Sequence, residues 1–460
     1  MSATQGIDIS GVIIVALIVG IFLGLYKFIQ SISSKNDTFN YKRDHKKAVD
    51  RPSYKGAKRM KEGVYIGSSA NKKSVFIPSD AKHVFVCGTT GSGKTVALSN
   101  FIKAGAEYGY PMLIVDGKGD TDLGSLLDIV KKTCSKRKIY VVNFNEPKKS
   151  DRYNPFKNTN TDVIKDMLIN MTNWSEEHYK YNTERYLQRL LKLMAMGDIE
   201  LSLDSLTRFL PIDNFNKLSK DLSVKELITK EERIEDSELA KISGSIAEGA
   251  AARFATIKES NLGQIFAGSG IDIYTALEED AIILFILNPL LYPEMSPLIG
   301  NLIVIDSKKA VSKLFEHKKK RIFYIFDEIN VYASTSLLDL VNKSRSANIT
   351  CILATQSLSD LDTVSNQFKE QIIENCNNYI ALRQNSSVNA EHWASVFGTR
   401  ETMQATYQIK DGESTELGSL RKTREFIYHP DDIKLLKAGS AIFLSRDEMK
   451  HTRVNINKPF

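Results

Sequence analysis

The sequence predicts an α/β protein whose mainly parallel sheet carries a phosphate-binding loop at one edge. Short, continuous apolar runs such as residues 112–115 and 281–286 are typical of strands buried on both faces. Helical patterns separate these runs, which favours helices layered on a sheet. One apolar run, residues 84–87, leads into a loop of the pattern G-x-x-x-x-G-K-[ST], and another, residues 322–326, ends in Asp-Glu.

The glycine-rich loop joins the apolar run at 84–87 to a helical pattern that begins at Val96. Its glycines allow backbone N–H groups to turn toward an anion, and the helix adds its positive N-terminal end. Lys94 is expected to reach the β- and γ-phosphates of ATP, and the Thr95 hydroxyl to bind Mg²⁺. A Gly/Ser-rich linker is the alternative, although a linker is not expected between two apolar elements. The predicted nucleotide-binding residues are Gly88, Thr89, Thr90, Gly91, Ser92, Gly93, Lys94 and Thr95.

Two further strands end in polar residues that suit a nucleotide site. Asp327 is expected to hold Mg²⁺, and Glu328 to polarise the attacking water as general base. A solvated turn is the alternative for this pair. Gln356, just after the run at 350–354, could sense the γ-phosphate or orient water, and a polar cap before the next helix explains it equally well. The cluster at 116–120 follows a strand, where ligand-facing groups collect, or it is a plain strand-to-helix turn.

Bulk properties place few limits on function. The chain has 460 residues, enough for two or three units, and an ordinary composition for a globular protein. A formal net charge of +7 mildly favours anionic partners. The four cysteines form no C-x-x-C pair and are interpreted as reduced core thiols rather than a disulfide framework or zinc site.

The amino terminus predicts a membrane helix over residues 9–29, preceded by a stub at 1–8. A cleaved signal peptide is less compatible, because residues 1–8 contain no Lys or Arg and no A-x-A-like site follows. Between residues 35 and 62 there are ten basic and four acidic side chains, which the positive-inside rule assigns to the cytoplasmic side. The sequence therefore predicts a single-pass protein of the cytoplasmic membrane with its N-terminus outside. Lipid contact is the preferred role of the basic linker at 30–62, and DNA binding is the alternative.

The remaining chain divides into a nucleotide-binding domain with a helical insertion. Residues 63–157 form its first part and residues 251–460 its second. Residues 158–250 show long helical patterns, for example apolar residues at 187, 190, 191 and 194, and are predicted to form an all-α insertion. Its aromatic and Met residues are interpreted as core rather than as a ligand site.

Taken together, these motifs resemble the coupling ATPases of type IV secretion and conjugative DNA transfer (the TraG/TraD type), within the RecA-like pumping ATPases. The blocks that carry the resemblance are HVFVCGTTGSGKT at 83–95, MLIVDGKGD at 112–120, YNPF at 153–156, FYIFDEI at 323–329 and SRSANITCILATQSLSDL at 344–361. The resemblance implies a RecA-like fold and a hexameric ring. It implies that Gln356 couples nucleotide state to substrate movement, and that Arg345 reaches the nucleotide of a neighbouring subunit. A solvated surface position is the alternative for Arg345.

Two departures from the family pattern matter. Many members have two membrane helices, whereas one is predicted here, and Gly117 replaces the proline common in the D-P-K-G block.

The resemblance implies an ATPase that moves DNA, single-stranded and relaxase-bound, into a conjugation channel, with channel proteins as partners. An FtsK-like translocase of double-stranded DNA and a nucleotide-gated docking receptor for secreted cargo are the alternatives.

Overall fold

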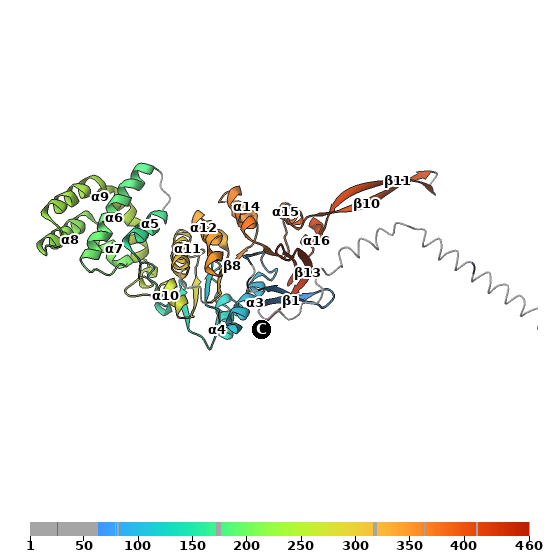
Figure 1. Ribbon diagram of the computed structural model, residues 1–460, viewed down its shortest axis with the longest axis horizontal. Helices are drawn as coiled ribbons and strands as arrows, with labels where there is room; N and C mark the ends of the chain where they lie inside the picture. Colours follow the sequence, from blue (N-terminus) through green and yellow to red (C-terminus); the bar gives the residue numbers. More distant parts are fainter. Residues whose placement is uncertain are drawn as a thin grey trace, which may run out of the picture. The chain divides into compact units, whose positions relative to one another are not determined.

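The computed structural model describes Leu25 and residues 63–78, 80, 82–171, 176–315, 320–362, 364–410 and 413–459. Within these ranges, eleven strands form one mixed sheet (Figure 1). Their spatial order is β2 (Ser74–Pro78), β1 (Gly63–Ser69), β13 (Lys450–Ile456), β12 (Ser440–Ser445), β9 (Asn378–Ala381), β3 (Val84–Cys87), β8 (Ile349–Thr355), β7 (Ile322–Asp327), β4 (Met112–Asp116), β6 (Ile282–Ile286) and β5 (Ile139–Asn143).

The seven strands from β9 to β5 are parallel, and the strands from β2 to β12 pair antiparallel. This outcome confirms the predicted α/β class with a mostly parallel sheet. The apolar runs became strands because β4, β6, β7 and β8 are buried along their whole length, where branched and aromatic side chains pack well.

Helices cover both faces of the sheet (Figure 1). On one face α3 (Lys94–Glu107) and α4 (Leu126–Thr133) pack into the core with Val86, Ile114 and Ile325. Figure 1 shows α11 (Met295–Leu314), α12 (Thr335–Ser344), α14 (Asn366–Asn375) and α15 (Ser387–Phe397) on the other face. Three shorter helices complete this part of the chain, namely α10 (Ile273–Glu278), α13 (Ser359–Asp362) and α16 (Pro430–Lys434). Four short 3₁₀ helices lie in the described connections, namely η1 (Pro147–Lys149), η2 (Asn261–Gln264), η3 (Ile329–Tyr332) and η4 (Arg345–Ala347).

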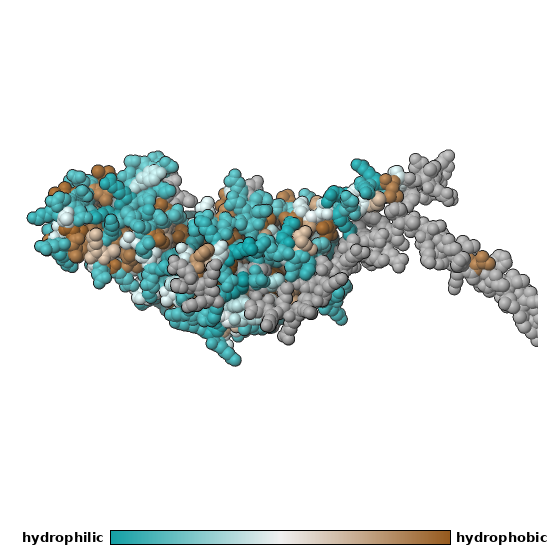
Figure 2. Space-filling view, viewed as in Figure 1, coloured by the Kyte–Doolittle hydropathy of each residue, from teal (hydrophilic) through white to brown (hydrophobic). Residues whose placement is uncertain are grey.

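The described residues of the predicted insertion at 158–250 form helices and connecting turns, with no strand among them. The insertion consists of α5 (Thr161–Asn170), α6 (Glu177–Met196), α7 (Leu203–Phe209), α8 (Ile212–Val224) and α9 (Lys230–Glu259). The predicted apolar face of α6 is buried, from Leu187 to Met194. A capping box between Thr229 and Glu232 starts α9, which crosses the predicted boundary at residue 250 because its Ala-rich sequence favours helix despite two glycines. Figure 2 shows apolar side chains on the surface of this insertion, and Val224, Leu227, Ile234 and Ile242 are exposed there.

Three strands were not predicted, β13 and the two strands of a hairpin. β13 follows β12 in the chain and lies between β12 and β1 in the sheet. β10 (Thr399–Lys410) and β11 (Glu413–Phe426) form an antiparallel hairpin with Thr399 opposite Phe426. The hairpin belongs to a unit separate from the one that contains the sheet. Its Thr- and Gln-rich alternation lacks the continuous apolar run on which the strand predictions were based.

The predicted localisation needs correction. The stub at 1–8, the membrane helix at 9–29 and the basic linker at 30–62 lie outside the described residues, apart from Leu25. Among the described residues, no helix combines the length and the apolar character that crossing a membrane requires. The three longest described helices, α6, α9 and α11, all carry charged residues. This finding contradicts the prediction of a single-pass protein of the cytoplasmic membrane, which we do not retain.

Candidate functional site

The predicted site residues, apart from Arg345, come together at the carboxyl end of the parallel strands. β3 lies beside β8, β8 beside β7, and β7 beside β4, all parallel. The glycine-rich loop follows β3, Gln356 follows β8, and Asp327 and Glu328 end β7. Asp116 ends β4 in register with Asp327. Because parallel strands present their carboxyl ends at one edge, residues distant in sequence meet there.

Glycines shape the loop at two positions. A Cβ at residue 88 would lie 2.5 Å from Ser92 Oγ and 2.6 Å from Leu382 Cβ, so only glycine fits against the loop and β9. Gly93 adopts φ 108°, in the region that favours glycine, and is the N-cap of α3 without a side-chain cap. The first N–H groups of α3 have no acceptor within the helix, which leaves them available to an anion.

Lys94 lies against both acids that end β7. Its Nζ donates a hydrogen bond to Glu328 Oε1 and is 3.8 Å from Asp327 Oδ1. All three side chains are buried, with the residues 8%, 2% and 5% exposed for Lys94, Asp327 and Glu328. One buried cation therefore faces two buried carboxylates, and the group has an excess of negative charge that a divalent cation would balance.

Gln356 completes the group from β8. Its Nε2 donates to Glu328 Oε1 at 2.9 Å, and its Oε1 accepts from Thr90 Oγ1 at 2.9 Å. The two alternative interpretations of Gln356 differ in whether it touches the acids, and the contact with Glu328 favours a role at the site over a simple helix cap.

Asp116 adds a third carboxyl group to this edge. Its Oδ1 accepts hydrogen bonds from the backbone N–H groups of Lys118 at 2.9 Å and Gly119 at 3.1 Å. Burial, reinforced by the Asp327 carboxylate, raises the pKa of Asp116 to about 7. Burial also raises the pKa of Asp327 to about 6, although the Lys94 ammonium opposes this shift. Lys118 points elsewhere, since its Nζ pairs with Asp120 at 2.8 Å.

The backbone at Glu328 is held from two sides. Glu328 adopts φ 50° and ψ 56°, a left-handed conformation that a non-glycine residue keeps only when its surroundings impose it. The preceding carbonyl of Asp327 accepts from Tyr332 Oη at 2.9 Å and from Gly117 N at 3.2 Å. A Cβ at residue 117 would lie 2.8 Å from that same carbonyl oxygen, and a proline would also lack the N–H. The glycine that departs from the family pattern therefore suits the local geometry. No sequence signal pointed to Tyr332.

Arg345 does not join this group within the chain. It lies in η4, before β8 begins, whereas Gln356 follows the same strand. Arg345 is therefore at the amino end of β8, the opposite edge of the sheet, and its side chain is exposed.

The residues present fit a nucleoside triphosphate with Mg²⁺. Ser92 Oγ is buried in the loop and has no hydrogen-bond partner among the described residues, which a phosphate oxygen would supply. The described residues contain no cluster of three or more His, Cys, Asp or Glu side chains suited to a metal ion. Mg²⁺ commonly uses one or two protein ligands together with phosphate oxygens and water, so this finding is compatible with the predicted ligands Thr95 and Asp327.

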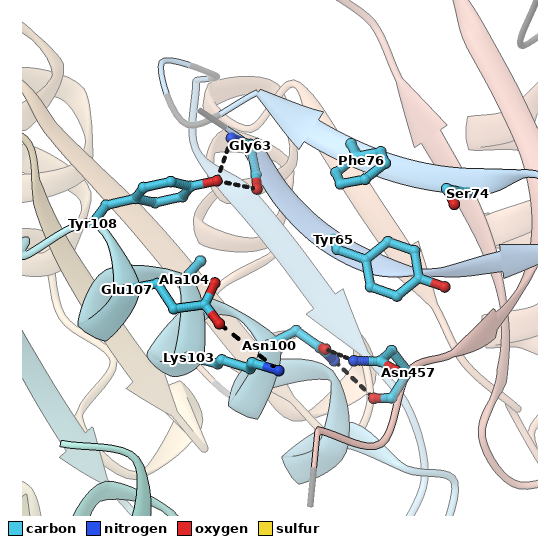
Figure 3. A pocket seen from close by; sticks show the side chains of 10 residues that line it. All are labelled: Gly63, Tyr65, Ser74, Phe76, Asn100, Lys103, Ala104, Glu107, Tyr108 and Asn457. Carbon is cyan, nitrogen blue, oxygen red and sulfur yellow. Dashed lines mark hydrogen bonds and ion pairs between the residues drawn. The ribbon is translucent and has the colours of Figure 1, made fainter. Parts of the chain in front are cut away.

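A groove lies between α3 and the strands β1 and β2, away from the glycine-rich loop (Figure 3). It is lined by β1, β2 and the C-terminal half of α3. The Tyr108 hydroxyl contacts both Gly63 N and Gly63 O at 3.1 Å, and the amides of Asn100 and Asn457 pair at one end. None of the residues predicted to bind nucleotide lines this groove.

Comparison with solved structures supports the fold. The bacterial conjugative coupling protein TrwB in its unbound monoclinic form is 19% identical, with TM-score 0.63 over 86% of this chain and 89% of that chain. TrwB in complex with ADP and Mg²⁺ is 19% identical, with TM-score 0.61 over 87% of this chain and 90% of that chain. VirB4 of Thermoanaerobacter pseudethanolicus is 12% identical, with TM-score 0.55 over 86% of this chain and 97% of that chain.

Comparison of sequences adds a family. An uncharacterised protein of Mycoplasma pneumoniae (strain ATCC 29342 / M129 / Subtype 1) is 32% identical over 101 residues, which are 22% of this chain and 67% of that protein. Residues 156–457 match the family described as the type IV secretion-system coupling protein DNA-binding domain. This match spans more than half of the sequence and agrees with the TrwB-like fold, so the chain belongs to the family of type IV secretion-system coupling proteins.

Proposed function

We propose that this protein hydrolyses ATP to drive DNA into a type IV secretion or conjugation channel. The observation that carries the proposal is the contact of Lys94, Glu328 and Gln356 beside the glycine-rich loop. These three residues come from three different segments, and each has the chemistry that phosphoryl transfer to water requires. The match to a coupling-protein DNA-binding domain supports DNA as the moved substrate.

The glycine-rich loop and the two acidic residues have different roles in this proposal. The loop N–H groups and Lys94 bind the phosphates, and Lys94 must leave Glu328 to do so. Glu328 then loses its cation and becomes free to accept a proton from the attacking water. Thr95 and Asp327 would hold Mg²⁺, which would neutralise negative charge on the phosphate oxygens. Gln356 lies beside Glu328, where its amide can report the presence of the γ-phosphate.

A neighbouring subunit is part of the proposal. Arg345 is exposed at the opposite edge of the sheet from the loop, so it can serve a nucleotide only across a subunit interface, as in a hexameric ring. Mixing Arg345→Ala subunits with Glu328→Gln subunits, each inactive alone, should regain part of the hydrolysis. A mixture as inactive as its components argues against action between subunits.

The helical insertion at 158–250 is proposed to recognise the DNA substrate with its attached relaxase.

The full-length protein provides the direct test. ATP hydrolysis should rise on addition of single-stranded DNA, and Lys94→Ala should abolish both the basal and the stimulated rate. Lys103→Ala is the matched control, because Lys103 lies on the same helix with a half-exposed side chain that pairs only loosely with Glu107 at 3.8 Å. Equal rates for wild type and Lys94→Ala would refute the proposal, and stimulation by duplex DNA alone would favour the FtsK-like alternative.

A further inference from the structure

The side chains around Glu328 form a chain that begins and ends in the glycine-rich loop. Thr90 Oγ1 donates to Gln356 Oε1 at 2.9 Å, and Gln356 Nε2 donates to Glu328 Oε1 at 2.9 Å. Lys94 Nζ, four residues after Thr90, donates to the same carboxylate oxygen. The chain thus connects the ends of β3, β8 and β7 through side chains alone.

The two ends of the Gln356 amide are held differently. Its Nε2 end depends on Glu328, whose own position depends on Lys94. Its Oε1 accepts a hydrogen bond from Thr90, a residue of the glycine-rich loop. Thr90 forms no ion pair, so its position does not change when the pair of Lys94 and Glu328 separates. When Lys94 moves to the phosphates, Glu328 becomes free to accept a proton from the attacking water. Its hydrogen bond with Gln356 Nε2 then weakens. The Thr90 contact is then the one that keeps the amide in place.

The Thr90 hydroxyl is not needed for the fold of the loop. The loop is fixed by backbone hydrogen bonds, from Gly88 N to Thr355 O at 3.2 Å and from Ser92 N to Thr89 O at 3.0 Å. Thr90 itself is exposed, and within the described residues its hydroxyl has one hydrogen-bond contact, with Gln356. The neighbouring Thr89 hydroxyl is buried and has no such partner in the same residues. The contact between Thr90 and Gln356 is therefore specific to one position of the loop.

We propose that Thr90 is a positioning residue that holds Gln356 over the reacting phosphate, an inference that rests on the proposed ATP hydrolysis. A hydroxyl that fixes one end of an amide leaves its Nε2 free to donate to the γ-phosphate or the water. Without the hydroxyl, the amide side chain samples several rotamers and spends less time in the productive one. The loss should appear in the rate of the chemical step and not in nucleotide affinity.

The test compares Thr90→Val, which keeps the branched shape and removes the hydroxyl, with Thr90→Ser, which keeps the hydroxyl. In the full-length protein, kcat for ATP hydrolysis should fall about fivefold in Thr90→Val, the effect of one neutral hydrogen bond. The KM for ATP and the affinity for a fluorescent ADP should stay within about twofold, and Thr90→Ser should retain most of the rate. Thermal unfolding checks that both variants fold.

A double-mutant cycle separates positioning from a general effect on the loop. In a Gln356→Ala background, Thr90→Val should cause no further loss of kcat, because its partner is already gone. An additive fivefold loss in that background, or an unchanged kcat in Thr90→Val alone, overturns the inference and leaves the proposed function intact. Absence of hydrolysis in the wild-type protein overturns both.

Discussion

Two buried lysine–carboxylate clusters in this protein have similar chemistry and different surroundings. In the first, Lys94 pairs with Glu328 beside Asp327 at the carboxyl edge of the sheet. In the second, Lys309 Nζ lies 2.6 Å from Asp306 Oδ1 on α11, on the face of the sheet opposite α3. Both lysines are 8% exposed, so exposure does not distinguish the two clusters.

The two clusters differ in the balance between ammonium and carboxylate groups. Asp306 Oδ2 accepts from Tyr153 Oη at 2.9 Å, and Lys309 also donates to Pro155 O at 2.8 Å and Thr159 Oγ1 at 2.9 Å. The second cluster is balanced in charge, with one ammonium against one carboxylate, although Asp306 Oδ1 has only the ion pair and no hydrogen bond among the described residues. It ties α11 to the YNPF segment, where the chain leaves for the helical insertion. The first cluster has more carboxylates than cations and a buried, unpartnered Ser92 Oγ in the adjoining loop. A cluster balanced in charge suits a structural role, and one with an excess of carboxylates suits a cationic ligand.

Replacing Glu328 by Gln should affect activity and not stability, whereas replacing Asp306 by Asn should affect stability. Glu328→Gln should lower kcat for ATP hydrolysis by about 10²–10⁴-fold, the usual contribution of a general base. Its stability should not fall, because the amide still accepts from Lys94 and Asp327 loses a neighbour of like charge. Phosphate release and thermal unfolding measure the two quantities. A variant that keeps more than about a tenth of the wild-type rate would show that Glu328 is not the base.

Asp306→Asn should lower the free energy of unfolding by about 3–5 kcal/mol, because it leaves the Lys309 ammonium buried without its counter-charge. Nucleotide affinity of the folded variant should be unchanged. Urea denaturation measures the loss. Asp339→Asn is the matched control, since Asp339 pairs with the adjacent Lys308 in a partly exposed ion pair and should cost less than about 1 kcal/mol. Equal small losses in both variants would mean that the buried cluster contributes no special stability.

The sequence predicted the first cluster and missed the second for a physical reason. The glycine-rich loop and the Asp-Glu pair are local patterns, and the carboxyl edge of a parallel sheet brings their partners together whatever lies between them. Asp306 and Lys309 are three residues apart on a helix, a spacing that sequence alone cannot distinguish from an exposed ion pair. Their burial depends on Tyr153, which is more than 150 residues away.

The same reasoning accounts for the other misses. Thr90 contacts Gln356 far along the chain, and Tyr332 contacts the carbonyl of Asp327, five residues before it. Individual side-chain contacts of this kind leave no periodicity in the sequence. β13 and the β10–β11 hairpin consist mostly of polar residues, so they lack the continuous apolar runs that marked the central strands. The central strands could be predicted because both of their faces are buried.

The excess of carboxylates at the first cluster should also make stability depend on pH. The pKa values of Asp116 and Asp327 are about 7 and about 6 in the folded protein and near 4 in the unfolded chain. Between these values the folded state binds more protons than the unfolded state, so these two groups lower the free energy of unfolding as pH rises from about 4 to about 7. The contribution levels off above the folded pKa values.

Burial of His83 acts in the opposite direction, because its pKa is lowered to about 4 and it stabilises the fold increasingly as pH rises toward about 6.5. The difference between wild type and Asp116→Asn removes this shared term. At pH 5.5 the variant should already be more stable, because Asp116 is ionised in the unfolded wild-type chain and must take up a proton on folding. At pH 8 this advantage should be larger by about a further 2 kcal/mol, because the wild type then carries a buried carboxylate beside Asp327. Urea denaturation of the nucleotide-free proteins at the two pH values measures the change. A constant difference across this range would mean that Asp116 does not contribute buried charge to the edge where the nucleotide is proposed to bind.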